Sequence, residues 1–322
     1  MGTMRHLGKT DLELSSIGLG CWQFSEGWGL VGGFWPALPQ PAVDEIVASS
    51  LAGGITWFDT AEAYGDGRSE RALARALTAA GKKPGEVLVA TKWMPVMRRA
   101  SNLTQTIGDR LAALSPWPID LHQVHQPYGL SSIEAEMKAM ADLVAEKKIR
   151  TVGVSNFNEA RTRKACAALA VRGLPLASNQ VKYSLLDRRI EKNGVLAAAK
   201  ELGVTIIAFS PLEQGLLSGK FHDDPKLVEQ IKGPRKWLPA FRRSGLEKSR
   251  PLIEELKKIA AAHGSTPSQV ALAWLVTFHG DTVVAIPGAT KTRHVEENVG
   301  AMKLTLSPQE LQRLDELSQR FI

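Results

Sequence analysis

The sequence has little cysteine and no long apolar segment. Its 322 residues include two cysteines, Cys21 and Cys166, which lie far apart and have no metal-ligand spacing. This excludes a disulfide framework and a zinc knuckle, and it is typical of a reducing compartment. No run approaches the roughly 18 apolar residues of a membrane span, and residues 1–14 lack the apolar core of a secretory signal. We therefore expect a cytoplasmic protein with no membrane segment.

The sequence also lacks a concentrated patch of charge. Forty Lys and Arg against 33 Asp and Glu leave a net charge of +7. The basic residues come as scattered pairs such as Arg98-Arg99 and Arg242-Arg243, which is typical of a solvated surface rather than of a nucleic-acid footprint. We expect no nucleic-acid partner. With 44% hydrophobic and 23% charged residues, the chain has the composition of an ordinary globular protein.

Eight short β-rich runs alternate with helical patterns along the chain. Strands that alternate with helices indicate a parallel sheet, and eight such units in about 300 residues favour a closed barrel. The β-rich runs are 17–20, 56–59, 87–91, 121–125, 151–155, 177–181, 204–209 and 282–286. The helical patterns include 42–51, 70–77, 103–114, 133–144, 161–169 and 195–202.

We predict an α/β fold, a (β/α)8 TIM barrel formed by residues 1–322 as one domain. Residues 4–15 read as a β-hairpin, which we expect to cap the bottom of the barrel. Segments 23–40 and 212–245 exceed normal connections and follow strand C-termini, so we expect long loops, and candidate lids, over the C-terminal face. Pairs of a hydroxyl with a carboxyl or amide three residues later predict helix starts at Ser131/Glu134, Thr266/Gln269 and Ser307/Glu310.

Three segments resemble known site motifs in residue pattern but not in structural context or spacing. The segment 27–32 has the form G-x-G-x-x-G, but the residues that follow, 33–36, cannot open the helix that binds pyrophosphate. The segment 215–220 resembles a phosphate loop whose glycines are too close together. His122 and His125 are three residues apart on a strand, so their side chains point to opposite faces. We expect no metal site.

Four polar residues end three successive predicted strands or begin the loop just beyond. Lys92 ends an apolar run, so its charge needs a partner, and Asp59 is the natural one. A tyrosine donates a proton slowly near neutral pH unless a cation favours its phenolate, and Lys92 could supply that field to Tyr64. His125 could then orient a substrate oxygen. The alternative reading is a buried Asp-Lys pair of purely structural importance with a tyrosine on the rim.

Seven ordered segments resemble the aldo-keto reductase superfamily over nearly the whole chain. The length of the chain, its 210–220 loop and the insertion after the first strand look more like the long microbial and plant branch, which is related to potassium-channel β-subunits, than like the short aldose reductases. This resemblance implies a TIM barrel that binds NADPH across its C-terminal face without a Rossmann domain. It also implies a catalytic tetrad, Asp59, Tyr64, Lys92 and His125, with Tyr64 as the proton donor. The matching segments are Gly18-Leu-Gly-Cys-Trp22, Phe58-Asp-Thr-Ala-Glu-Ala-Tyr64-Gly65, Asp120-Leu-His-Gln-Val-His125, Gly153-Val-Ser-Asn-Phe157, 180–186, 210–220 and 286–298.

The resemblance also implies the cofactor contacts. The nicotinamide carboxamide would be held by Ser155, Asn156 and Gln180, and Tyr183 would stack on the nicotinamide ring. The 210–220 loop would straddle the pyrophosphate through Ser210, Leu212 and Lys220. The 2′-phosphate would meet Thr290, Lys291 and Arg293, and the adenine would meet Glu297 and Asn298. Two cations at this place favour NADPH over NADH. Further expected contacts are Cys21, Trp22, Pro211, Gln214, Gly215, Gly288 and His294.

We expect NADPH-dependent reduction of an aldehyde or ketone, a small-molecule carbonyl substrate. Tryptophans and a tyrosine on or near the rim would favour aromatic or apolar carbonyl compounds. These residues are Trp22, Trp28, Trp35, Trp93 and Tyr128. Gln126 and Lys182 depart from the pattern of many relatives and affect the expected substrate more than the reaction. Two alternatives remain: a cofactor-sensing regulatory subunit with slow or no turnover, and a barrel of another chemistry.

Overall fold

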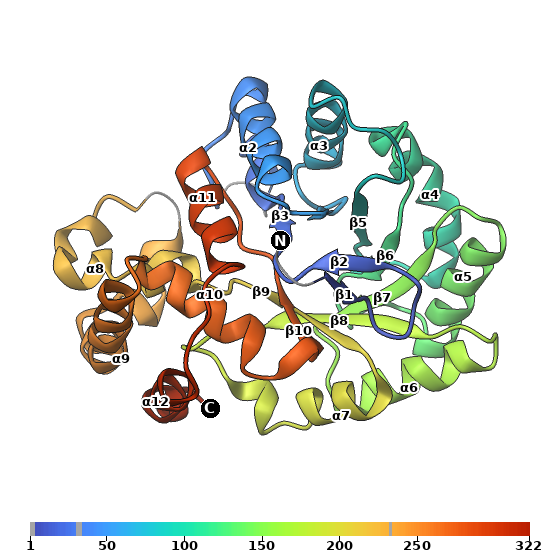
Figure 1. Cartoon of the computed structure of the whole chain (residues 1–322). Helices are drawn as coiled ribbons and strands as arrows, with labels where there is room; N and C mark the ends of the chain where they lie inside the picture. Colours follow the sequence, from blue (N-terminus) through green and yellow to red (C-terminus); the bar gives the residue numbers. More distant parts are fainter. Residues whose placement is uncertain (1–3, 30–33, 232–233) are drawn as a thin grey trace.

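The computed structural model describes residues 4–29, 34–231 and 234–322. Eight parallel strands curl around a common axis, each paired with the next in chain order (Figure 1). Backbone pairing of Ile17 with Ala285 and of Gly20 with Gly288 joins the first strand to the last. The sheet therefore closes into the predicted barrel. The strands are β3 (Leu19–Gly20), β4 (Trp57–Asp59), β5 (Leu88–Trp93), β6 (Leu121–Val124), β7 (Thr151–Ser155), β8 (Leu176–Lys182), β9 (Thr205–Phe209) and β10 (Val283–Ala285).

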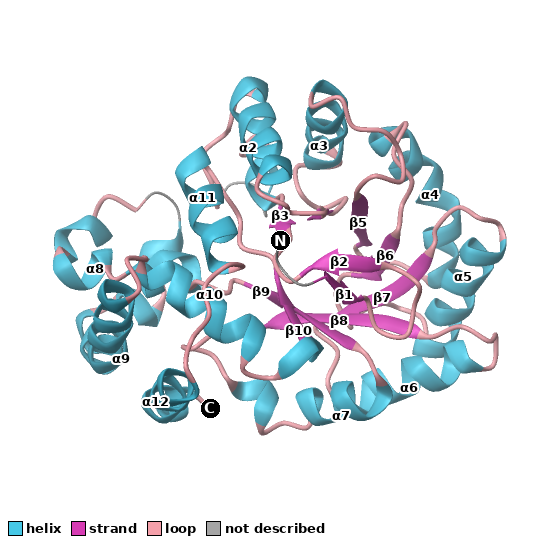
Figure 2. Cartoon of the chain, in the orientation of Figure 1, coloured by secondary structure: helices cyan, strands magenta, loops and turns pink. Residues whose placement is uncertain are grey.

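Helices surround the sheet on its outside (Figure 2). The six predicted helical patterns are confirmed, most of them extended by a few residues. They are α2 (Gln40–Ala52), α3 (Arg68–Ala79), α4 (Ala100–Leu114), α5 (Ile133–Ala145), α6 (Glu159–Ala170) and α7 (Val195–Leu202). The remaining helices are α8 (Lys220–Asp223), α9 (Arg243–Ala262), α10 (Pro267–Thr277), α11 (Thr292–Ala301) and α12 (Pro308–Ser318). No helix of the described residues is both long and apolar enough to cross a membrane.

The N-terminal hairpin closes the bottom of the barrel, as predicted. Strands β1 (Met4–His6) and β2 (Glu13–Ser15) pair antiparallel. The turn fits closely, because a Cβ on Gly8, whose φ is +59°, would lie 2.5 Å from the carbonyl oxygen of Ala177. Leucines of the hairpin pack against inward-facing residues at the lower ends of the strands. This bottom layer consists of Leu7, Leu12, Leu14, Trp57, Ala90, Leu121, Ala177, Ile207 and Val284.

Two of the three predicted helix caps are confirmed. Thr266 and Ser307 each form a reciprocal capping box at the start of α10 and α12. The third prediction is off by one residue. Ser132 caps α5, accepting a hydrogen bond from the backbone of Ala135. The hydroxyl oxygen of Ser131 instead accepts one from the backbone of Ala100, so it joins the loop to the start of α4.

The two long segments lie at the C-terminal face but are not plain loops. The segment 23–40 carries the end of a 3-10 turn, Trp22–Phe24, and the start of α2. Residues 30–33, which include half of the G-x-G-x-x-G match, lie outside the described residues. The segment 212–245 contains several 3-10 turns and α8, and it builds a small apolar core of its own. That core is formed by Leu216, Phe221 and Phe241, together with Leu246 of α9.

The sequence patterns did not predict α9, whose first turn falls within the expected 212–245 loop. This helix carries Gly245 near its start and Pro251 inside it, and both residues argue against a helix. Its buried face, which includes Leu252 and Leu256, packs against α10 and α12. Tertiary packing therefore outweighs the unfavourable local propensity.

Candidate active site

The four residues Asp59, Tyr64, Lys92 and His125 meet at the C-terminal rim of the barrel. Asp59 ends β4, Lys92 lies near the end of β5, and His125 directly follows β6. Tyr64 belongs to the loop after β4. The Nζ atom of Lys92 is 2.5 Å from Asp59 Oδ1 and 3.3 Å from the Tyr64 hydroxyl oxygen. It also donates to the carbonyl oxygen of Thr60 at 2.8 Å, so all three of its protons have acceptors.

Burial and charge act against one another in this group. Burial opposes the charge on Lys92, but the Asp59 carboxylate and Tyr64 outweigh it and hold the pKa of Lys92 above its ordinary value. Burial raises the pKa of Tyr64, and the Lys92 ammonium acts in the opposite direction. The phenol therefore keeps its proton at neutral pH, while the adjacent cation favours its release. This is the arrangement that a proton donor needs.

His125 completes the group on the other side of Tyr64. The two rings meet edge to face, with centroids 5.7 Å apart. Burial, and after it the charge of Lys92, holds the pKa of His125 well below its ordinary value, so the imidazole is neutral at neutral pH. Its Nδ1 atom has no hydrogen-bond partner within the described part of the chain. A neutral ring of this kind can hydrogen-bond an uncharged oxygen.

A second buried network, which the sequence reasoning missed, holds the loop that carries Tyr64. Glu62, two residues earlier, accepts hydrogen bonds from the backbone of Met94 at 2.6 Å and from Arg98 at 2.7 Å. Its other oxygen pairs with Arg110 at 2.8 Å, and Arg110 in turn pairs with Glu70 at 3.0 Å. The only signal in the sequence is an acidic residue inside the Phe58–Gly65 segment. The network fixes this loop to β5 and α4.

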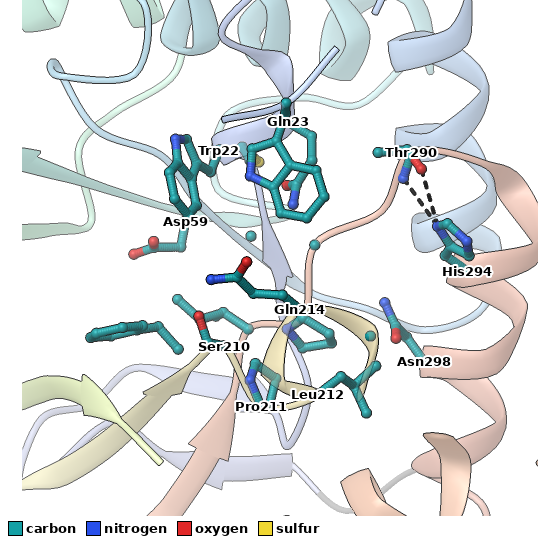
Figure 3. A pocket seen from close by; sticks show the side chains of 18 of the residues that line it. Trp22, Gln23, Asp59, Ser210, Pro211, Leu212, Gln214, Thr290, His294 and Asn298 are labelled. Atoms are coloured by element: carbon teal, nitrogen blue, oxygen red, sulfur yellow. Dashed lines mark hydrogen bonds between the residues drawn. The ribbon is translucent and has the colours of Figure 1, made fainter. Parts of the chain in front are cut away.

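A cavity of about 700 Å³ opens at this rim. Asp59, Tyr64 and His125 line it. In Figure 3, Asp59 and Trp22 stand on one wall, and His294 and Asn298 of α11 stand on the opposite wall. The cavity brings together most of the residues predicted as cofactor contacts. These are Cys21, Trp22, Ser155, Asn156, Gln180, Ser210, Pro211, Leu212, Gln214, Gly215, Lys220, Gly288, Thr290, Lys291, His294, Glu297 and Asn298.

Tyr183 does not lie in the cavity, which corrects the expectation that it stacks on a ligand there. Its ring is fully buried on the outer side of the sheet, 6.3 Å from the ring of Trp274, and its hydroxyl donates to Glu191 at 2.6 Å. The reason is strand parity: Gln180 faces inward, so a residue three positions later faces outward. Phe209, at the end of β9, is an aromatic residue that does line the cavity.

Three of the five predicted substrate-pocket aromatics also lie elsewhere. Trp93 follows the inward-facing Lys92, so its ring is buried on the outer side, where its indole donates to Asn102 at 3.0 Å. Trp28 is 58% exposed and stacks under the guanidinium group of Arg68. Tyr128 is 67% exposed. The other two, Trp22 and Trp35, line the cavity, and their rings meet edge to face at 6.0 Å.

The backbone is strained where it borders the cavity. Asn156, Ser210 and Gln214 all line it with positive φ angles of 61°, 51° and 55°. Non-glycine residues adopt this conformation at a free-energy cost of about 1–3 kcal/mol, and such strain clusters at ligand sites. The arrangement therefore marks the cavity as a site of function.

The residues around α11 fit an elongated anionic ligand. Lys220, Lys291 and His294 line the cavity close to the first turn of α11, which has no side-chain cap, and the N-terminus of a helix stabilises an anion. Thr290 turns toward His294 Nδ1 with its backbone nitrogen and its hydroxyl, each at 3.3 Å (Figure 3). The amide nitrogen of Asn298 is buried without a partner among the described residues. Arg293 points away and is 79% exposed on its side chain, 3.4 Å from Glu297.

Comparison with known proteins agrees with this geometry. Residues 16–319 match the model of the Aldo/keto reductase family. An uncharacterized oxidoreductase of Mycobacterium tuberculosis, Rv2298, is 39% identical over 310 residues, which cover 96% of this chain and 91% of that protein. The structure of glycerol dehydrogenase AKR11B4 from Gluconobacter oxydans superposes with a TM-score of 0.83 at 28% identity and covers 99% of this chain and 96% of that one. The thermostable aldo-keto reductase Tm1743, solved with the inhibitor epalrestat, gives a TM-score of 0.78 at 29% identity, with 98% and 99% covered.

Proposed function

The chain belongs to the aldo/keto reductase family of oxidoreductases, and from this premise we propose that it reduces aldehydes or ketones to alcohols with NADPH. The observation that carries the proposal is the continuous contact from Asp59 through Lys92 to Tyr64 at the wall of a cavity. NADPH supplies the hydride when it is bound. The chain supplies the proton and the geometry.

Tyr64 is the proton donor in this proposal. Lys92 lies 3.3 Å from the Tyr64 hydroxyl, so its charge stabilises the phenolate that remains when the proton moves to the substrate oxygen. Asp59 holds Lys92 in place. His125, neutral and at the cavity wall, donates a hydrogen bond to the same substrate oxygen and so orients the carbonyl group toward Tyr64.

The cofactor would extend from the tetrad to α11. Ser155, Asn156 and the amide of Gln180 would hold the carboxamide, and Phe209 takes the stacking role first expected of Tyr183. Lys291 and Lys220 would neutralise phosphate groups near the first turn of α11. Glu297 and Asn298 would face the adenine. The exposed Arg293 would contribute to NADPH preference only by its long-range charge.

The substrate end of the cavity favours an uncharged aromatic or apolar carbonyl compound. Trp22 stacks 6.1 Å from the Tyr64 ring, and Trp35, Pro36 and Leu38 line the cavity with it. Indole and aliphatic surfaces contribute favourable burial to apolar ligands. A polyol such as glycerol, the substrate named for the Gluconobacter relative, would bury little apolar surface against these side chains.

The first experiment follows NADPH oxidation by absorbance with aromatic aldehydes, short aldehydes, dicarbonyls and ketones, with NADH in parallel. We expect turnover with NADPH, less with NADH, and the highest kcat/KM for aromatic carbonyls. Tyr64→Phe should lose more than about 100-fold in kcat, since it removes the general acid, and should keep its affinity for NADPH.

Tyr128→Phe is the matched control, because it removes the hydroxyl of an exposed tyrosine outside the cavity, and we expect wild-type kcat. Full activity of Tyr64→Phe would contradict the assignment of the proton donor. Tight binding of NADPH without turnover of any carbonyl by the wild type would instead favour the cofactor-sensing regulatory protein.

A further inference from the structure

Two glutamines donate hydrogen bonds to Asp59 Oδ2, the carboxylate oxygen that Lys92 does not contact. Gln123 lies on β6, in register with Lys92 on β5. Its Nε2 atom donates to Asp59 Oδ2 at 3.0 Å, and the Nε2 atom of Gln180 donates to the same oxygen at 2.9 Å. Gln180 also donates to Gln123 Oε1 at 3.3 Å. The Asp59 carboxylate is therefore held on both oxygens.

The chemistry of these groups fixes their orientation. A carboxylate next to an ammonium group only accepts hydrogen bonds, so both amide nitrogens must face Asp59. The amide oxygen of Gln180 takes no part in the network, and Gln180 lines the cavity. Gln123 is fully buried and is not among the residues that line the cavity. Its hydrogen bonds lead to Asp59 and Gln180, which line the cavity, and through them it can act on a ligand.

The barrel makes room for this side chain. Gly153 on β7 is the register partner of Gln123, and a Cβ at this position would lie 2.9 Å from Gln123 Cγ. The same Cβ would lie 2.5 Å from Ser178 Oγ and 3.0 Å from Leu121 Cδ1, so a larger residue on β7 would displace Gln123 or these neighbours. The neighbouring strand thus accommodates a polar side chain in a part of the interior where burying an apolar residue would cost less desolvation free energy.

We propose that Gln123 is a positioning residue for proton donation by Tyr64. Its amide keeps Asp59 Oδ2 fixed, so that Oδ1 stays on Lys92 and Lys92 stays beside the Tyr64 hydroxyl. It also offsets part of the carboxylate charge that Tyr64 feels. This proposal rests on the proposed reductase function, and it concerns a residue outside the tetrad.

Two substitutions at this position distinguish positioning from packing. Gln123→Met keeps nearly the same volume and removes the donor, and we expect kcat to fall about tenfold at every pH, as for the loss of a hydrogen bond to a charged group. The KM for NADPH should stay within about twofold, because Gln123 does not touch the cavity. A role in packing alone predicts wild-type kcat for this variant, since swaps that conserve volume are well tolerated.

Gln123→Glu adds a pH signature. Burial and the nearby Asp59 carboxylate raise the pKa of a carboxyl at this position. At low pH the protonated carboxyl donates to Asp59 and activity approaches that of the wild type. As the pH rises the group ionises, repels Asp59 and loses activity. A pH profile identical to that of the wild type would overturn the proposal, and this variant also decides the matter if Gln123→Met does not fold.

The controls are Gln312→Met and Gln312→Glu, which make the same changes on the exposed face of α12, and we expect wild-type profiles. A readout independent of turnover is the ultraviolet difference titration of tyrosine, with Tyr64→Phe subtracted to isolate Tyr64. We expect Gln123→Met to raise the Tyr64 titration midpoint, because the Asp59 charge raises the pKa of Tyr64 and the amide offsets that charge. An unchanged midpoint would overturn the positioning role even if the wild type reduces no carbonyl.

Discussion

The two ends of the barrel interior are built from the same strands and do opposite things. At the bottom, Trp57, Ala90 and Leu121 face the hairpin leucines in an apolar layer. Two residues further along the same strands, Asp59, Lys92 and Gln123 form a buried polar layer. The side-chain period of a strand puts both sets on the inner face. A step of two residues thus separates a layer that stabilises the fold from one whose groups are arranged for chemistry.

The largest expected effect comes from breaking the polar layer. Lys92→Met should reduce kcat by about 1,000-fold, because Tyr64 loses the cation beside it. It should also lower the free energy of unfolding by about 3–5 kcal/mol, because Asp59 is left as a buried unpaired charge. Steady-state kinetics and urea unfolding measure the two effects.

The double variant Asp59→Asn with Lys92→Met separates these effects. It removes the unpaired charge, so most of the stability should return while turnover does not. Recovery of kcat in the double variant would show that stability alone limits the activity of Lys92→Met.

A substitution in the apolar layer should lower stability without lowering turnover. Leu14→Ala should lower the free energy of unfolding by about 2–5 kcal/mol, through lost burial and the cavity left behind. The kcat per folded molecule should stay unchanged, because Leu14 lies in the hairpin at the end of the barrel opposite the tetrad. A loss of kcat at full folding, checked by circular dichroism, would show that the bottom layer also positions the polar one.

A pH effect sharpens the comparison on the outer face of β6, at His122. Burial lowers the pKa of His122 to about 3, so the folded state holds this imidazole neutral while the unfolded chain protonates it near pH 6.5. Its contribution to stability is present above pH 6.5 and is lost as the pH falls toward 3, by about 1.4 kcal/mol per unit. In His122→Gln the free energy of unfolding should fall less steeply with decreasing pH below 6.5, by about 1.4 kcal/mol per pH unit. An unchanged slope would show that this imidazole does not set the acid sensitivity.

The elements that the sequence predicted correctly are those whose apolar pattern is local. All eight strands were found because each is a short β-rich run between turns, and the ends moved by at most two residues. The helix α9 was missed because Gly245 and Pro251 disfavour a helix locally. The helix is stabilised by packing of its apolar face against α10 and α12. Propensity describes a segment in isolation, whereas burial depends on partners far away in the chain.

The errors at the site have a common physical cause. Tyr183 and Trp93 were assigned to the cavity, although each lies an odd number of positions from an inward-facing residue, Gln180 and Lys92 respectively. Strand parity rules such residues out of the interior, and it would have selected Phe209, two positions after the inward-facing Ile207. Trp28 and Tyr128 lie in loops, where no periodicity constrains the direction of a side chain.

Gln123 escaped notice for another reason. It lies inside the family-matching segment Asp120–His125, but its amide carries no charge and the segment by itself assigns it no role. Its importance comes from Asp59 and Gln180, which are distant in sequence, and only the closed barrel brings the three together.

The seam of the barrel has a consequence for synthesis of the protein. Pairing of Ile17 with Ala285 and of Gly20 with Gly288 joins the beginning of the chain to its last strand, and the cavity wall runs from Gly20 to Asn298. A growing chain on the ribosome therefore has no complete binding cavity until nearly all of it has been translated and released. A ligand that contacts both walls of the cavity can therefore bind the closed barrel but not the incomplete chain.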